Sequence, residues 1–221
     1  SSSGAPWVKP EHAMQVVAWS EIQVEGPREF NEVLPKIKAP QVYAPVDYSR
    51  DIAVFAFPAE YTAKRDGDFL GRTAVNRQDG LLPLTAEQGK RPGMPKDGLR
   101  VITTSLDPSG RLRWTVPAGK WTILRVGHVP TGKNNHPAPP EGDGLEVDKL
   151  SREALDAFWQ GGMAKVISDA GPLAGPVLNN ALVDSYEVGS QNWTPLFRQE
   201  FQRRRGYDML PCLPVVAGVT V

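Results

Sequence analysis

The sequence is poor in cysteine, has no excess of either charge and contains no long apolar run. Its one cysteine, Cys212, excludes a disulfide within the chain and any cysteine-rich zinc site, although it does not decide the compartment. The 25 basic residues balance the 25 acidic ones, so the overall charge gives no reason to expect nucleic acid as a partner. No apolar stretch approaches the length of a membrane span, and the N-terminal residues lack the pattern of a signal peptide.

What is present is enough apolar material for a folded core. Of the 221 residues, 40% are hydrophobic, which suits one large domain or two small ones. The chain begins with SSSGAPWVKP, without a methionine, and ends with the apolar stretch VVAGVTV. We therefore expect it to be a piece of a longer protein.

The middle of the chain is rich in predicted strands. Apolar residues alternate or run continuously over short stretches that proline and glycine interrupt, for example at Gly26-Pro27. The predicted strands are 15–24, 51–57, 99–104, 111–116 and 121–129. Residues 107–110 and 117–120 have the composition of tight turns between the last three strands. Short strands joined in this way favour a β-sandwich or jelly-roll-like module.

The C-terminal third has α/β character. Ser151 is a predicted N-cap for one helix that ends at Gly171-Pro172, and a second helix runs from Thr194-Pro195 to Arg205. Between them, residues 177–183 resemble a short buried strand. The β-α repetition is typical of a parallel sheet or barrel.

The predicted fold class is therefore α/β, with part of a (β/α)8 barrel interrupted by a β-rich, sandwich-like insertion. We assign residues 1–14 to a barrel loop and helix start and residues 15–130 to the β-rich insertion. Residues 131–221 are assigned to a βαβα segment of the barrel that is truncated at its C-terminal side.

Carboxylates at the ends of predicted strands are the first candidates for chemistry. Asp184 and Glu187 follow the strand at 177–183, and Glu146 and Asp148 end the candidate strand before it. In a barrel, such ends face the mouth where substrates bind. Glycosidic bond cleavage requires two carboxyl groups, one that protonates the leaving oxygen and one that activates water or attacks carbon. Acids that merely begin a solvated loop would give the same pattern, so both interpretations stay open.

Other side chains near these acids suit a sugar ligand. Tyr186 and Trp193 could pack on the apolar face of a sugar ring, or equally in the core. His136 lies in a polar, proline-stiffened loop, where it could bind hydroxyl groups or simply be exposed. The three histidines of the chain match no zinc spacing.

Three long stretches resemble glycoside hydrolase family 106, the α-L-rhamnosidase family. They are SSSGAPWVKPEHAM, VPAGKWTILRVGHVPTGKNNHPAPPEGDGLEVDKLSREALDAFW and LNNALVDSYEVGSQNWTPLFRQEFQRRRGYDMLPCLPV. The resemblance implies a catalytic barrel with β-rich insertions. It also implies inverting cleavage of terminal α-L-rhamnose in plant or bacterial polysaccharides by two glutamates, with a calcium ion as cofactor and export to the periplasm or medium.

The resemblance also suggests roles for individual residues. Glu187, in the DSYE motif, matches the general acid, whereas the second glutamate is expected on a later barrel strand outside this sequence. The chain alone is therefore expected to be inactive, with the rest of the barrel as its partner. The expected substrate-binding residues are Asp184, Tyr186, His136, Asp148, Lys149 and Trp193. Sugar and metal contacts are not distinguished among them, and the calcium ligands stay unassigned.

Two alternatives belong to other classes. One is a non-catalytic carbohydrate-binding module, whose sugar affinity would survive loss of Glu187 but not loss of the β-rich region. The other is a structural fragment without a competent site, which would neither bind nor cleave sugar.

Overall fold

The structure, a computed structural model, describes residues 3–39, 42–63, 93–182, 186 and 188–220. The chain forms two compact units. The loop-helix unit consists of Ser1–Val16, Val42–Tyr48 and Pro130–Leu196. The sheet unit consists of Val17–Gln41, Ser49–Val129 and Phe197–Val221.

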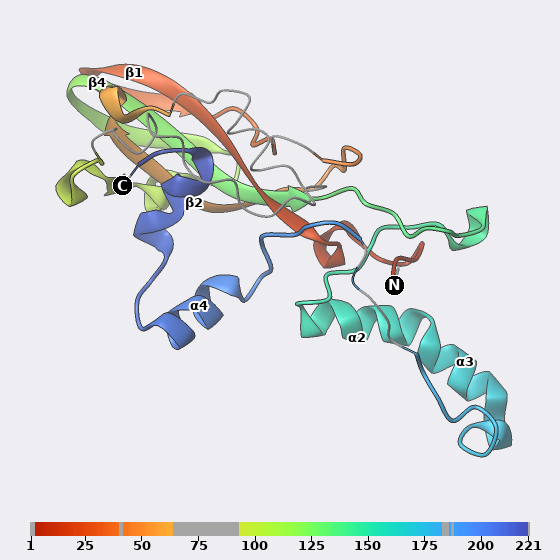
Figure 1. The fold of residues 1–221 in the computed structure, drawn as a ribbon. Helices are drawn as coiled ribbons and strands as arrows, with labels where there is room; N and C mark the ends of the chain where they lie inside the picture. The colour runs from red at the N-terminus through yellow and green to blue at the C-terminus, as the bar shows by residue number, and fades with distance from the viewer. Residues whose placement is uncertain (1–2, 40–41, 64–92, 183–185, 187, 221) are drawn as a thin grey trace. The chain divides into compact units, whose positions relative to one another are not determined.

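A four-stranded sheet dominates the sheet unit (Figure 1). Its strands are β1 (Gln15–Val33), β2 (Arg50–Pro58), β3 (Arg100–Val101) and β4 (Arg111–Pro130). Their order is β1-β4-β2-β3, and β2 is antiparallel to both of its neighbours. Five successive residues of β2, Ala53 to Phe57, have no exposed surface, so both faces of this strand are covered. That burial explains why its sequence is continuously apolar rather than alternating.

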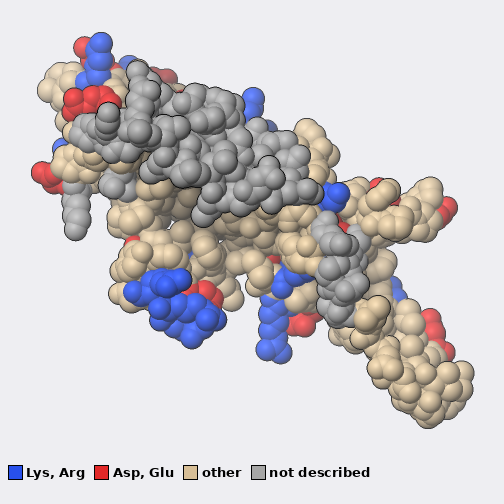
Figure 2. All heavy atoms as spheres, viewed as in Figure 1, with Lys and Arg blue, Asp and Glu red and all other residues tan. Residues whose placement is uncertain are grey.

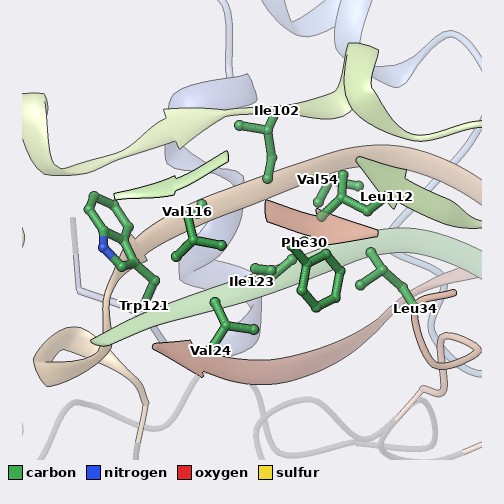
Figure 3. Close-up of a cluster of buried hydrophobic side chains, with 10 residues drawn as sticks. Val24, Phe30, Leu34, Val54, Ile102, Leu112, Val116, Trp121 and Ile123 are labelled. Atoms are coloured by element: carbon green, nitrogen blue, oxygen red, sulfur yellow. The ribbon is translucent and has the colours of Figure 1, made fainter. Parts of the chain in front are cut away.

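Side chains from three of the strands and from the segments beside them form the core of the sheet unit (Figure 3). Its buried members are Val24, Phe30, Leu34, Val54, Ala56, Ile102, Leu112, Val116, Trp121 and Ile123. Trp114 meets Trp121 edge to face, with ring centroids 5.7 Å apart. Such an aromatic contact adds to the stabilisation from apolar burial.

The helices are short. In the loop-helix unit they are η1 (Pro10–His12), η6 (Pro140–Gly142), α2 (Arg152–Gly161), α3 (Met163–Ala170) and η7 (Gly171–Leu173). Among the described residues of the sheet unit they are η2 (Ala59–Tyr61), η4 (Lys96–Gly98), η5 (Thr103–Ser105), α4 (Phe197–Arg205) and η8 (Leu210–Ala217). Basic side chains gather over α4 (Figure 2), where Arg203 and Arg204 bind Glu200. No described helix has the length and apolar character needed to cross a membrane.

The predicted α/β fold, with part of a (β/α)8 barrel around a sandwich-like insertion, is wrong. The described strands form one antiparallel sheet rather than strands of a parallel barrel. The segment predicted as a buried barrel strand is exposed where it is described, with 68% of Val177 and 90% of Leu182 accessible. An aliphatic run shows a preference for burial, but a strand also needs a neighbour to pair with. Among the described residues 177–182, only Leu178 makes a bridge, to Ala174. The predicted boundaries at 14 and 130 stay a prediction.

Within the sheet, the predicted short strands merge into longer ones. A break between strands was predicted at Gly26-Pro27 and at residues 117–120. Strands β1 and β4 instead continue through these positions. At Gly26 a Cβ atom would lie 2.1 Å from the carbonyl oxygen of Pro117. The glycine therefore permits a close approach of β1 and β4 instead of ending a strand.

The predicted helix after Ser151 is present but divided. The Ser151 side chain accepts a hydrogen bond from the Ala154 amide, as an N-cap does. The helix breaks at Gly162, between α2 and α3. Trp7 explains the two glycines at this break, because a Cβ atom on Gly161 would lie 2.1 Å from its ring. The indole also donates to the Phe158 carbonyl at 3.2 Å and stacks on the Phe158 ring.

Candidate active site

An extended segment, residues 144–148, positions two of the candidate carboxylates within the loop-helix unit. Single antiparallel bridges join Leu145 to Asn134 on one side and Val147 to Ala13 on the other. In an extended chain, residues two apart share a face, so Glu146 and Asp148 point to the same side. Both are buried, with 0% and 1% of their surface exposed. Buried carboxylates are costly unless they are paired, so their partners define the site.

The Glu146 carboxylate has partners for both oxygens. The Ser3 amide donates to Oε2 at 2.9 Å and to Oε1 at 3.2 Å. The Lys149 ammonium donates to Oε2 at 2.8 Å. Together, an amide and an ammonium offset the cost of burying this charge.

Asp148 has partners for only one oxygen. Oδ1 accepts hydrogen bonds from the Leu150 amide at 2.9 Å and from Nε2 of Gln191 at 2.7 Å. Oδ2 is buried and has no hydrogen-bond partner among the described residues. An acceptor oxygen in that state is uncommon in folded proteins and is a candidate for binding a ligand.

Gln191 connects Asp148 to an aromatic side chain. Its Nε2 donates to the Trp193 carbonyl at 3.1 Å as well as to Asp148, and its Oε1 lies 3.4 Å from the Tyr186 hydroxyl. Sequence reasoning missed Gln191, because a neutral amide in a polar loop gives no sign that it serves a buried carboxylate.

Tyr186 is the exposed member of this cluster, with 50% of its surface accessible. The Lys149 ammonium lies 5.4 Å from the centre of its ring, a cation–π distance. Partial burial raises the pKa of its phenol, and the charges of Asp148, Glu146 and Tyr43 act in the same direction. Tyr186 therefore stays a neutral donor and an aromatic surface at ordinary pH.

We call Glu146, Asp148, Lys149, Tyr186 and Gln191 the carboxylate cluster. It brings together three of the predicted substrate-binding residues, Asp148, Lys149 and Tyr186. His136 is exposed in its loop, and Trp193 is only 6% exposed, which leaves a sugar ring little surface to contact. Asp184 and Glu187 lie outside the described residues. The predicted sugar contacts of all these residues, and the catalytic role of Glu187, stay predictions.

The calcium ion that the resemblance implies stays a prediction. Among the described residues, no group of three or more carboxylate, histidine or cysteine side chains converges. Calcium takes six to eight oxygen ligands. In the carboxylate cluster, Asp148 Oδ2 is a single available oxygen, and Glu146 is already bound to an ammonium.

Carboxyl groups and an exposed aromatic ring are groups that a sugar-binding site can use. The fold is similar to that of a solved structure, a rhamnosidase from Novosphingobium sp. PP1Y, with a TM-score of 0.76 and 24% identity. That match covers 100% of this chain and 34% of the other.

A family model described as alpha-L-rhamnosidase matches residues 1–53 and 61–221. The chain therefore belongs to this family of glycoside hydrolases, which confirms the resemblance found in the sequence. A curated relative from Formosa agariphila, provisionally named a beta-glucuronidase, is 43% identical over 100% of this chain. The chain spans only 19% of the length of that relative.

Proposed function

We propose that the protein to which this chain belongs hydrolyses terminal α-L-rhamnosyl residues of plant or bacterial oligo- and polysaccharides. The observation that carries the proposal is the family match, because it includes every residue of the carboxylate cluster. A sugar polymer as substrate also favours a periplasmic or secreted location. This location is part of the proposal.

The proposed mechanism is inversion with two carboxyl groups. Glu187 protonates the leaving oxygen, while a carboxylate outside this sequence removes a proton from a water on the opposite face of the sugar. Those two groups should stand roughly 6.5–9.5 Å apart, which leaves room for the water. Without that carboxylate, the chain by itself is proposed to be inactive.

In this mechanism the carboxylate cluster binds the sugar. Tyr186 offers a half-exposed ring and a neutral hydroxyl, both of which suit a pyranose. The bond to Glu146 fixes the position of the Lys149 ammonium. Its remaining N–H groups can therefore donate to a sugar from a defined position. Asp148 supplies an acceptor oxygen. His136 and Asp184 are proposed as further sugar contacts, in line with the family motif.

A second candidate activity is cleavage of β-glucuronides, which the name of the Formosa agariphila relative suggests. The charge of the cluster argues against it. A glucuronide carries a carboxylate at neutral pH, whereas a rhamnoside is neutral. In the cluster, two carboxylates face one ammonium, and that ammonium is already bound to Glu146. A neutral sugar therefore fits the described residues better than an anionic one.

Turnover of two aryl glycosides by the full-length protein tests the proposal. An aryl α-L-rhamnoside should be cleaved and the matching β-D-glucuronide should not. For an inverting enzyme, the first sugar anomer seen by NMR is β-L-rhamnose. Glu187→Gln should abolish cleavage. The control is Glu141→Gln, the same substitution at a glutamate on η6, which should leave cleavage unchanged. Binding of rhamnosides without any turnover would favour the non-catalytic carbohydrate-binding module.

A further inference from the structure

The two oxygens of the buried Asp148 carboxylate differ in their hydrogen bonding. Oδ1 accepts two hydrogen bonds, from the Leu150 amide and from Gln191. Oδ2 has no partner among the described residues, and the whole side chain is 1% exposed. Folded proteins seldom leave a buried carboxylate oxygen without a donor, because the loss of hydration is then not compensated.

We propose that Asp148 presents Oδ2 as the acceptor for a sugar hydroxyl group, and that Gln191 is a positioning residue that keeps this oxygen available. This inference rests on the proposed function. It adds which atom meets the sugar and assigns a role to a residue that sequence reasoning missed.

The hydrogen bonds of Gln191 fix which way its amide faces. Its two N–H bonds are directed at two acceptors, Oδ1 of Asp148 and the Trp193 carbonyl. If the amide were reversed, its oxygen would face both of those acceptors, which is unfavourable. The N–H of Gln191 therefore holds one oxygen of the Asp148 carboxylate and leaves the other oxygen directed away from this amide.

No cation of the carboxylate cluster binds Oδ2. The one ammonium in the cluster, that of Lys149, binds Glu146 at 2.8 Å. Tyr186 lies beside the two carboxylates, because its hydroxyl is 3.4 Å from Oε1 of Gln191, which binds Asp148, and its ring is 5.4 Å from the ammonium that binds Glu146. Half of its surface is exposed. A pyranose placed against this ring would carry several hydroxyl donors within reach of the cluster.

The test compares Asp148→Asn with the wild type in the full-length protein. The asparagine oxygen can keep the contacts of Oδ1, so the fold is retained, but an N–H donor replaces Oδ2. The KM for an aryl α-L-rhamnoside should rise about 10- to 100-fold, the range expected for a lost charged hydrogen bond. Asp143→Asn is the matched control, because this exposed carboxylate binds only the Asn134 amide among the contacts described.

Monodeoxy rhamnosides identify the hydroxyl. The wild type should lose affinity for one of them, whereas Asp148→Asn should bind that analogue and the parent sugar equally well. Unchanged KM and unchanged discrimination in Asp148→Asn, with an active wild type, would overturn the inference and indicate that Oδ2 has no contact with the sugar. Absence of turnover by the wild type on every glycoside would instead contradict the proposed function, and the inference with it.

Gln191→Glu tests the positioning role separately. The new carboxyl would lie about as close to Asp148 as the amide does, and two carboxylates at hydrogen-bond distance share a proton. Activity should therefore survive at low pH and fall as pH rises and that proton is lost. The other titratable groups near this position are the same in the wild type and the variant: Glu146, Lys149, Tyr186 and Tyr43. The difference between the two pH profiles therefore belongs to the new carboxyl group at position 191. A loss that is equal at every pH would show a purely structural role and overturn this assignment.

Discussion

The ammonium of Lys149 lies 2.8 Å from Oε2 of Glu146, a carboxylate with no exposed surface. The lysine itself keeps 18% of its side chain accessible. The pair is therefore asymmetric, because loss of the lysine leaves a buried charge, whereas loss of the glutamate leaves a cation that can turn toward water.

The first prediction follows from this asymmetry. Lys149→Met should destabilise the protein by about 3 kcal/mol, the lower part of the range for removing one partner of a buried pair. Urea unfolding of the wild type and the variant measures the difference. Arg204→Met, which removes one ion pair of the exposed Glu200, is the control and should leave the unfolding midpoint unchanged. Equal effects of the two substitutions would show that Glu146 is not held by its lysine.

A second prediction concerns the contact of Trp7 with the end of α2. In Gly161→Ala the added methyl group would lie 2.1 Å from the indole, so the ring must move away from Phe158. We expect a loss of about 1–3 kcal/mol from this overpacking, together with a change in tryptophan fluorescence. At Gly142 an added Cβ would lie 3.4 Å from Pro139, so Gly142→Ala should be tolerated. Similar melting temperatures for the two variants would contradict the packing of Trp7.

The helices show which sequence signals determine structure locally. The N-cap at Ser151 and the helix end at Gly206 could be predicted because each depends on a few neighbouring residues. The break at Gly162 could not, because its cause is Trp7, more than 150 positions away. Strand positions were also predicted in β1, β2 and β4, but their lengths and pairing depend on close approaches such as that of Gly26 to Pro117.

The site shows the same limit. Asp148, Lys149 and Tyr186 could be named from the sequence because their residue types suit sugar chemistry. The link that Gln191 makes between Asp148 and Tyr186 depends on two hydrogen bonds, and the one to Asp148 joins residues 43 positions apart in the sequence. The predicted barrel failed for a related reason. A β-α-β pattern indicates parallel strands only if the strands pair, and the described strands pair in an antiparallel sheet instead.

A third prediction distinguishes arginine from lysine in the sheet unit. Arg125 binds both oxygens of Asp51, at 2.7 and 2.9 Å, and also donates to the Pro35 carbonyl at 3.3 Å. A lysine cannot reproduce this fork, so Arg125→Lys should cost about 1–2 kcal/mol although the charge is kept. Chemical unfolding measures the change. Arg113→Lys, at an exposed arginine that meets Asp107 at 3.5 Å, should have almost no effect.

The last prediction is a pH dependence that begins at His128. This histidine lies on β4 opposite Arg50 of β2, and burial, helped by the Arg50 charge, lowers its pKa from 6.5 to about 4, against the opposing effect of Asp51. Between these two values the unfolded chain binds a proton at this position that the folded protein does not. Stability therefore rises as pH increases from about 4 to 6.5, is fully present above that range, and is lost as pH falls through it.

The shift corresponds to at most about 3 kcal/mol, since one pKa unit is about 1.4 kcal/mol. The free energy of unfolding, measured at several pH values between 4 and 7, should fall more steeply toward acid in the wild type than in His128→Gln. Carboxylates that also titrate below pH 5 are common to both proteins, so the difference between the two curves belongs to this histidine. His12→Gln is the control and should leave the pH dependence of the unfolding free energy unchanged. The ion-pair partner of His12, Glu153, lies 3.8 Å away and its side chain is 86% exposed. Parallel curves for the wild type and His128→Gln would show that the histidine is protonated alike in the folded and unfolded states.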